Sequence, residues 1–282
     1  MRSNELVRMF RYPSMIKSAA FCAACFAFLS VVFKNSLILI PEVTEVRFCN
    51  ILACTLGIWF GPAGAWGCAV GNLVGDLGGS LTDLSFSGFF GNFFSAWLPY
   101  KVWCVWGSAA GEPPTSRPSL RAKNWLLRYL VGGFFSVVTC SAVLAVSFDR
   151  SGDMPAANTF AMIFLNNAGA TLLGIALFAL SCFLPEKLLV CWRAQMTDER
   201  ELSFPASDKK RLTVLLAVSA ALSVYMPVYM LAHGVTLRTM DAFGSVFPIA
   251  LCIIYTAAQI IVTLSCRWKA APRETQGAVS LD

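Results

Sequence analysis

The segment from residue 57 to residue 103 is an apolar run that is interrupted by glycines and by a few polar side chains at helical spacing. It reads GIWFGPAGAWGCAVGNLVGDLGGSLTDLSFSGFFGNFFSAWLPYKVW. An amide or a carboxylate inside hydrocarbon costs several kcal/mol unless it is paired or faces a water-filled cavity. Asn72, Asp76 and Asn92 therefore predict a packed polar interior, which we interpret as the working centre of the protein.

The composition places this run in a membrane protein. Hydrophobic residues make up 57% of the 282 residues and charged residues only 13%, with a mean hydropathy of +0.64. Such a chain has too little polar surface for a soluble domain. Its net charge of +6 resides in the connecting segments, which is typical of membrane orientation and not of nucleic-acid binding. We expect an all-α, polytopic membrane helix bundle that contacts lipid and binds no nucleic acid.

Eight apolar stretches follow one another along the chain, and they predict about eight transmembrane helices. Their approximate bounds are 18–40, 48–60, 63–80, 86–106, 125–148, 159–184, 212–232 and 243–265. Six are near or above the roughly 20 residues that a spanning helix needs. The second and third are short and are separated by Gly61-Pro62, which argues against one continuous helix because proline removes a helical hydrogen bond. They form either two short spans or a re-entrant hairpin.

The distribution of lysine and arginine predicts the topology. Residues 1–17, 107–124 and 185–211 are rich in basic side chains, whereas residues 149–158 and 233–242 carry one arginine each. Because basic residues in short loops favour the cytoplasm, we expect both termini and both basic loops on the cytoplasmic side of the plasma (inner) membrane.

Aromatic residues surround Lys101 near the predicted inner end of the fourth span. They are Trp97, Tyr100, Trp103 and Trp106. Amphipathic rings are enriched at the level of the lipid headgroups. The cluster is therefore expected to anchor this helix at the membrane surface.

The third span combines two features at a spacing of four residues. Gly71, Gly75 and Gly79 form a smooth stripe that lets another backbone approach closely. Asn72 and Asp76 lie one above the other on the adjacent face of the same helix. We expect Asp76 to bind a ligand, an ion or a proton, because no basic residue lies nearby in the sequence to neutralise its negative charge.

Later spans supply further polar side chains that could line one pocket opening to the outside. They are Asn92 beside Gly88 and Gly91, then Ser136, Thr139 and Ser141, and then Asn166 and Asn167. Arg47, on the outer side, could bind an anionic or amide-bearing ligand at the mouth of this pocket. Two alternatives remain open: the amides could simply hold membrane helices together, and Arg47 could form a surface ion pair with Glu45.

The segment from Pro41 to Trp103 resembles the substrate-binding S-components of energy-coupling factor transporters and related membrane modules. The resemblance rests on the motifs PEVTEVR, GIWFGPAGAWG, GNLVGD, GFFGNFF and LPYKVW. It implies that residues 1–185 form a six-helix domain that captures a vitamin-like micronutrient or related compound from outside. It also implies a transmembrane coupling protein with two ATPases as partners, docked on small residues of the first helix, here Ala20, Ala24 and Ala27.

The chain extends beyond such a domain. A cytoplasmic linker, residues 186–211, is expected to precede two additional transmembrane helices within residues 212–266 and a cytoplasmic tail, residues 267–282. The sequence contains no GxxxxGK[ST] phosphate loop, so ATP hydrolysis would come from a partner. It also contains no residue pattern that is typical of a catalytic site, a cofactor site or a metal site. Uptake of a small solute is the leading hypothesis, and a ligand-sensing or scaffolding module that transports nothing is the alternative.

Overall fold

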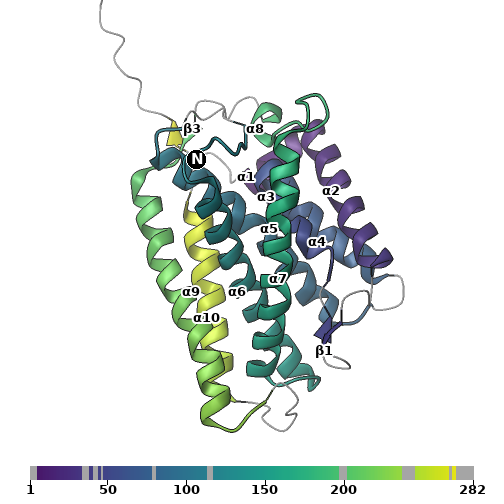
Figure 1. The fold of residues 1–282 in the computed structure, drawn as a ribbon, viewed down its shortest axis with the longest axis vertical. Helices are drawn as coiled ribbons and strands as arrows, with labels where there is room; N and C mark the ends of the chain where they lie inside the picture. The colour runs from purple at the N-terminus through teal and green to yellow at the C-terminus, as the bar shows by residue number, and fades with distance from the viewer. Residues whose placement is uncertain are drawn as a thin grey trace, which may run out of the picture.

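The computed structural model describes residues 5–33, 38–40, 44–45, 47–77, 81–112, 117–196, 202–236, 245–266 and 269–270, and nearly all of these are helical (Figure 1). The long helices are α2 (Pro13–Val32), α3 (Asn50–Phe60), α4 (Pro62–Asp76), α5 (Leu84–Ala109), α6 (Trp125–Ser151), α7 (Ala156–Cys182), α9 (Ala206–Ala232) and α10 (Val246–Ser265). The short elements are α1 (Glu5–Arg8), the 3-10 helix η1 (Met9–Arg11), α8 (Trp192–Gln195), and the strands β1 (Ile38–Ile40), β2 (Thr44–Glu45), β3 (Leu202–Ser203) and β4 (Lys269–Ala270).

The long helices occupy the places that the apolar stretches predict, but their number as membrane spans is not confirmed. Five of them, α2, α6, α7, α9 and α10, are long and apolar enough to cross a membrane. Helices α3 and α4 contain 11 and 15 residues, fewer than the roughly 20 that a simple span needs. The first stretch was also predicted to remain helical to Ile40, which is wrong: α2 ends at Val32, and β1 pairs with β2 in an antiparallel ribbon.

Helices α3 and α4 form a hairpin with its tip at Gly61. Gly61 has φ +54°, a conformation that side chains disfavour, and Pro62 then starts α4 with its fixed backbone angle. The first residue of α3, Asn50, and the last residue of α4, Asp76, line the same cavity, so the two helices run antiparallel. The tip lies against Trp192 of α8, where a β-carbon on Gly61 would come within 2.9 Å of the indole.

The glycine stripe of α4 packs against α2, as the spacing predicted. A β-carbon on Gly71 would lie 2.7 Å from the carbonyl oxygen of Ala23, and one on Gly75 would lie 2.8 Å from Oγ of Ser30. Both distances are shorter than ordinary van der Waals contact. At Gly71 the neighbour is backbone, so glycine permits the close approach of α2, whereas at Gly75 the neighbour is the Ser30 side chain. Gly79, the third member of the predicted stripe, lies outside the described residues.

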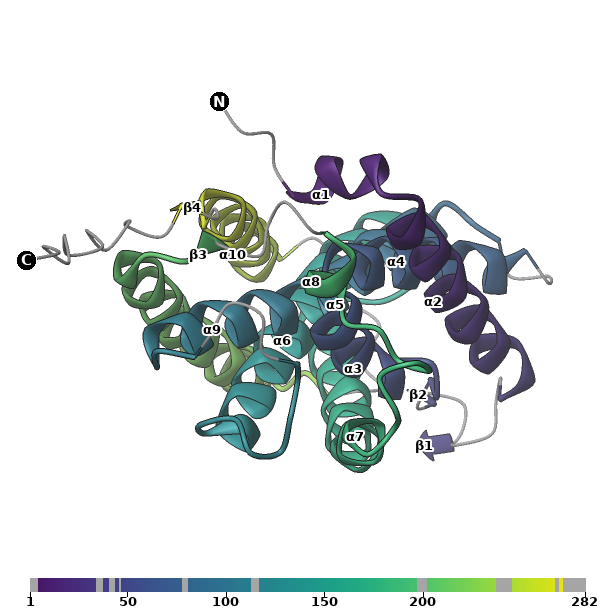
Figure 2. The same cartoon turned by 90° about the horizontal axis from the view of Figure 1, so that it is seen from above.

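Helices α5 and α6 pack against each other within the bundle, and α2 and the α9–α10 pair lie at opposite edges (Figure 2). A buried polar network joins α10 to its neighbours. Tyr255 Oη lies 3.2 Å from Thr139 Oγ1 of α6 and 2.8 Å from Ser219 Oγ of α9, and it accepts a hydrogen bond from Gln259 Nε2 at 2.6 Å. The two additional helices are thus part of one packed bundle.

The aromatic cluster around Lys101 is buried, which contradicts its predicted place at the membrane surface. Lys101 is 1% exposed, and Trp97 and Tyr100 are fully buried. The ammonium group pairs with Glu5 of α1, donates a hydrogen bond to the Cys266 carbonyl oxygen at 2.7 Å and lies 4.5 Å from the centre of the Trp97 ring. The rings therefore enclose an ion pair between α5 and α1, and Lys101 also binds the residue that follows α10.

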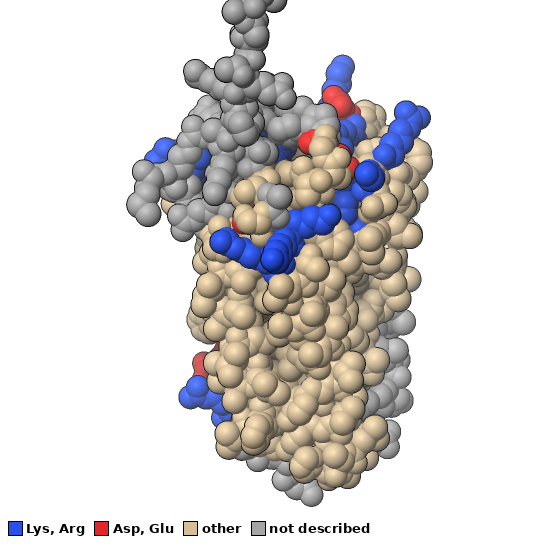
Figure 3. Space-filling view, turned by 90° about the vertical axis from the view of Figure 1, so that its left-hand side faces the viewer, with Lys and Arg blue, Asp and Glu red and all other residues tan. Residues whose placement is uncertain are grey.

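The charged side chains are unevenly distributed between the two ends of the bundle. Figure 3 shows lysine and arginine gathered in a band at one end, above a long surface that is almost free of charge. The band belongs to the end that carries the N-terminal helix and α8 (Figure 1). We call this the basic end.

Candidate binding site

A cavity of about 260 Å³ lies among α3, α4, α5, α6 and α7, away from the basic end. Its wall comes from the start of α3, the last residue of α4, the start of α5, the second half of α6 and the first half of α7. The lining residues are Arg47, Asn50, Asp76, Thr82, Leu84, Ser85, Gly88, Asn92, Cys140, Leu144, Phe148, Met162, Ile163, Asn166 and Asn167. The lining is thus mixed, with apolar side chains from α5, α6 and α7 and with amides and one carboxylate from α3, α4, α5 and α7.

A chain of hydrogen bonds fixes the polar groups on α4 and α5. Asn72 Nδ2 donates to Asp76 Oδ2 at 3.2 Å, one helical turn further along α4. Asn92 Nδ2 donates to Asn72 Oδ1 and to the Gly88 carbonyl oxygen, both at 2.9 Å. An amide nitrogen has two protons, so the donor capacity of Asn92 is fully used.

The same chain leaves one acceptor without a partner. Asn92 lines the cavity and is 5% exposed, but its Oδ1 is buried, and no donor among the described residues reaches that oxygen. A buried acceptor without a partner is unfavourable by about 1–3 kcal/mol. Asp76 adds carboxylate oxygens to the same wall and is 6% exposed. This wall is therefore suited to a ligand that donates hydrogen bonds.

Glycine at position 88 makes room for this arrangement. A β-carbon there would lie 2.7 Å from Nδ2 of Asn72, well inside van der Waals contact. The next glycine on the same helix, Gly91, faces α6, where a β-carbon would lie 3.0 Å from Sγ of Cys140. The predicted close-approach patch beside Asn92 therefore exists, and each of its glycines faces a different neighbour.

Helices α3 and α7 contribute a second group of amides. Asn50 Nδ2 donates to Asn167 Oδ1 at 2.6 Å, and Asn166, 6% exposed, lines the cavity beside it. Arg47 lies just before α3 with an exposed side chain, and it is the basic residue among those lining the cavity. Arg47 is thus placed to meet a ligand at the entrance, while the asparagines and Asp76 lie deeper.

The structure brings together five of the six residues predicted to bind substrate. Arg47, Asp76, Asn92, Asn166 and Asn167 all line the cavity. The sixth, Asn72, is fully buried and is not among the lining residues; it contacts Asp76 and Asn92 from behind. Its place indicates that it orients the other two side chains.

The serine and threonine residues of α6 that were expected in the pocket bond elsewhere. Ser136 donates to the Ser95 carbonyl oxygen, Ser141 donates to the Val137 carbonyl oxygen of its own helix, and Thr139 faces Tyr255. The lining residues that the sequence analysis did not name are Asn50, Thr82, Leu84, Ser85, Cys140, Leu144, Phe148, Met162 and Ile163. No spacing pattern in the sequence indicates Asn50, because its partner Asn167 lies on α7.

The three alanines predicted to dock a partner differ in exposure. Ala20 and Ala24 are exposed on the outer face of α2, beside the exposed rings of Phe21 and Phe28. Ala27 is 8% exposed and faces α4, with its Cα 3.9 Å from the position that a β-carbon would take on Gly75. Of the three, only Ala20 and Ala24 are placed where another protein could reach them.

Comparison with known proteins identifies one family. The family model described as QueT transporter matches residues 16–181, which is more than half of the chain. The matched region begins in α2 and ends in α7, so it contains the cavity and leaves out α9 and α10. Neither a curated protein nor a solved structure matches the chain at a significant level.

Proposed function

Because the chain belongs to the QueT transporter family, whose members are S-components of energy-coupling factor transporters, we propose that it captures a queuosine precursor in the cavity beside Asp76 for uptake driven by partner ATPases. Membership in the family supports a membrane S-component for solute uptake. The nature of the solute and the coupling to ATP are our proposal. The observation that supports the solute most directly is the Asp76 carboxylate beside Asn92 in the wall of the cavity, which we call the acceptor wall.

The chemistry of a queuosine precursor suits that wall. Queuosine contains a 7-deazaguanine base, and the guanine edge carries a ring N–H and an amino group as adjacent donors. A carboxylate accepts such paired donors through two oxygens. Asn166 and Asn167 add two amide side chains to the α7 side of the cavity.

The size of the cavity favours a free base. Its volume of about 260 Å³ is just below the range of about 300–1,000 Å³ for pockets that hold drug-sized ligands. The apolar side chains Leu144, Phe148, Met162 and Ile163 also line the cavity, and a flat heterocycle can pack against them. We therefore assign the cavity to a base without its ribose.

The distribution of charge supports an outward-facing cavity. Basic residues gather at the end of the bundle away from the cavity (Figure 3), and basic loops favour the cytoplasmic side. In this orientation both chain ends lie in the cytoplasm and the cavity opens to the outside of the plasma membrane. Ala20 and Ala24 then lie on an open helix face at the edge opposite α9 and α10 (Figure 2), where a coupling protein could pack closely.

Uptake in cells tests this function. Cells that lack their own route for 7-deazaguanine bases would express the chain with a coupling protein and its ATPases, with an ATPase variant that cannot hydrolyse ATP as the control. We expect labelled base to accumulate only with the active ATPases and to be lost in Asp76→Asn. Accumulation that is the same without the ATPases, or with Asp76→Asn, would contradict the proposal.

One observation favours the alternative of a sensing or scaffolding module. Helices α9 and α10 lie outside the matched region yet are joined to α6 by the buried network around Tyr255. Such a pair could transmit ligand binding to another protein. The same uptake experiment separates the two functions, because a sensor would bind the base without accumulating it in cells that contain active ATPases.

A further inference from the structure

Arg47 brings a positive charge to the cavity beside Asp76. Among the described residues that line this cavity, Arg47 is the basic one and Asp76 is the acidic one. Arg47 lies in the segment just before α3, and its side chain is exposed, whereas Asp76 is 6% exposed. The cavity therefore has a cation at its entrance and an anion deeper within.

These two charges do not neutralise each other. The ion pairs found among the described residues include neither Arg47 nor Asp76. The Asp76 carboxylate accepts a hydrogen bond from Asn72, and the Arg47 side chain makes no hydrogen bond within the described part of the chain. A guanidinium has five N–H donors, so those of Arg47 are available to water or to a ligand.

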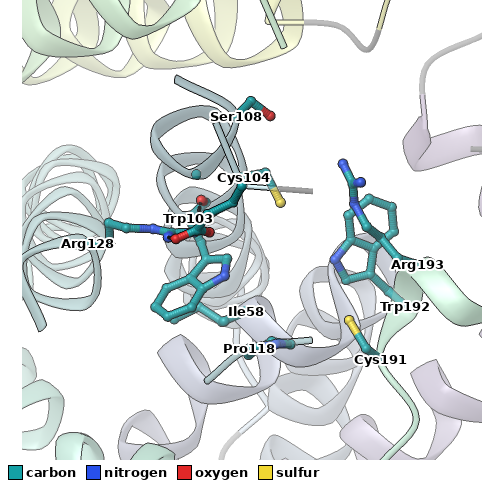
Figure 4. A pocket seen from close by; sticks show the side chains of 11 residues that line it. Ile58, Trp103, Cys104, Ser108, Pro118, Arg128, Cys191, Trp192 and Arg193 are labelled. Carbon is teal, nitrogen blue, oxygen red and sulfur yellow. Dashed lines mark hydrogen bonds and ion pairs between the residues drawn. The ribbon is translucent and has the colours of Figure 1, made fainter. Parts of the chain in front are cut away.

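An arginine at the basic end shows the opposite case. Arg128 is 2% exposed, and its Nη1 donates to both carboxylate oxygens of Glu112 at 2.7 Å. Its guanidinium carbon lies 4.1 Å from the centre of the Trp103 ring, and Figure 4 shows the two side chains next to each other. The fold thus supplies the counter-charge that a buried guanidinium needs. No carboxylate plays this part for Arg47 among the residues that the structure describes.

A 7-deazaguanine base carries an acceptor next to its donors. Its carbonyl oxygen lies beside the ring N–H that is assigned above to the Asp76 carboxylate. Arginine commonly reads guanine through this oxygen and the neighbouring ring nitrogen. A 7-deazaguanine lacks that nitrogen, so the oxygen is the acceptor that remains. Arg47 and Asp76 therefore offer complementary partners to adjacent groups of one base.

We propose that Arg47 determines specificity by donating hydrogen bonds to the carbonyl oxygen of the base. A charge-assisted bond of this kind is stronger than a bond between neutral groups, so the cavity discriminates against bases with a weaker acceptor at this position. The inference rests on the proposed function, because it takes a 7-deazaguanine base as the solute. The competing role for Arg47 is a surface ion pair with Glu45, whose side chain lies outside the described residues.

Calorimetric titration of the purified full chain tests this role with two compounds. One is the 7-deazaguanine base, and the other is its thiocarbonyl analogue, which keeps both donors and replaces the oxygen by sulfur, a weak acceptor. The parent should bind the base at least about fivefold more tightly than the analogue. Arg47→Gln should bind the base at least about fivefold more weakly than the parent does and should no longer distinguish the two compounds.

Two further variants serve as controls. Arg150→Gln removes an exposed arginine in the last turn of α6 that does not line the cavity, and it should keep the parental preference for the base. Glu45→Gln should keep that preference too. If Arg47 acted only through an ion pair with Glu45, then Glu45→Gln and Arg47→Gln would have the same effect.

The outcomes separate this inference from the proposed function. Equal binding of the two compounds by the parent, or a parental preference for the base in Arg47→Gln, would overturn the role of Arg47 and leave the solute as proposed. Failure of the base to bind the parent would contradict the proposed function and this inference with it. Arg47 is exposed, so its substitution spares the interior of the bundle, and thermal unfolding in the same detergent reports whether each variant is folded.

Discussion

Replacement of Gly88 by alanine should weaken solute binding while leaving the bundle folded. The new β-carbon would lie 2.7 Å from Asn72 Nδ2, and ordinary contact begins near 3.4 Å, so the amide must move by about 0.7 Å. Asn72 is bonded to Asp76 at 3.2 Å and to Asn92 at 2.9 Å. The movement therefore lengthens or breaks at least one bond that orients the acceptor wall.

The expected magnitudes follow from those bonds. A hydrogen bond to a charged group contributes about 1.5–3 kcal/mol, and alanine is favoured over glycine within a helix by about 1 kcal/mol. The loss of folding stability should therefore stay below about 2 kcal/mol. Binding should weaken by about tenfold, or 1.4 kcal/mol, because the ligand must bind to misplaced acceptors.

Calorimetric titration of the purified protein and thermal unfolding in the same detergent measure the two effects. Gly169→Ala is the matched control, because Gly169 also lies within a helix, α7, and a β-carbon there would meet nothing within 4 Å. It should bind as the parent does and be equally or more stable. If Gly88→Ala bound the solute with parental affinity, the orienting role of Asn72 would be refuted.

The remaining predictions concern the carboxylate, the glycine stripe and the outer face of α2. Asp76→Asn and Asn72→Leu should each weaken binding by at least about 1 kcal/mol in the same titration, since charge-assisted bonds contribute about 1.5–3 kcal/mol; parental affinity in Asp76→Asn would favour a packing role. Gly75→Leu should prevent folding, seen as aggregation in size-exclusion chromatography, because α2 leaves no space there. Ala20→Trp with Ala24→Trp should abolish co-purification with the coupling protein and retain binding, since close packing fails; loss of both properties would indicate a role within the bundle.

The polar interior could be predicted because the few polar residues within long apolar segments are easily recognised in the sequence. Polar side chains such as Asp76 and Asn92 are costly within a membrane helix and therefore usually mark a functional site. Both residues line the cavity. Asn72 could be placed on the face of Asp76 by its spacing. Its indirect role could not be predicted, because that depends on Asn92 reaching it from α5.

The predictions that failed concern residues whose contacts are made by a segment far away in the sequence. Lys101 and its aromatic neighbours match the pattern of a membrane-surface belt, but Glu5, 96 positions away, pairs with the ammonium group inside the fold. Ile38–Ile40 continues the apolar composition of α2, yet it pairs with β2. Asn50 was missed because its contact is with Asn167, 117 positions along the chain. Spacing within one helix carries no information on such contacts.

The most direct test of the central claim is a titration of the purified protein with a 7-deazaguanine base and with an analogue methylated on the ring nitrogen of its guanine edge. The base should bind in a ratio of one to one, and the methylated analogue should bind at least about tenfold more weakly because it lacks a donor for the acceptor wall, a difference of about 1.4 kcal/mol. Asp76→Asn should reduce this difference. Equal affinity for the two compounds, or no binding of the base at millimolar concentration, would contradict the assignment of this cavity.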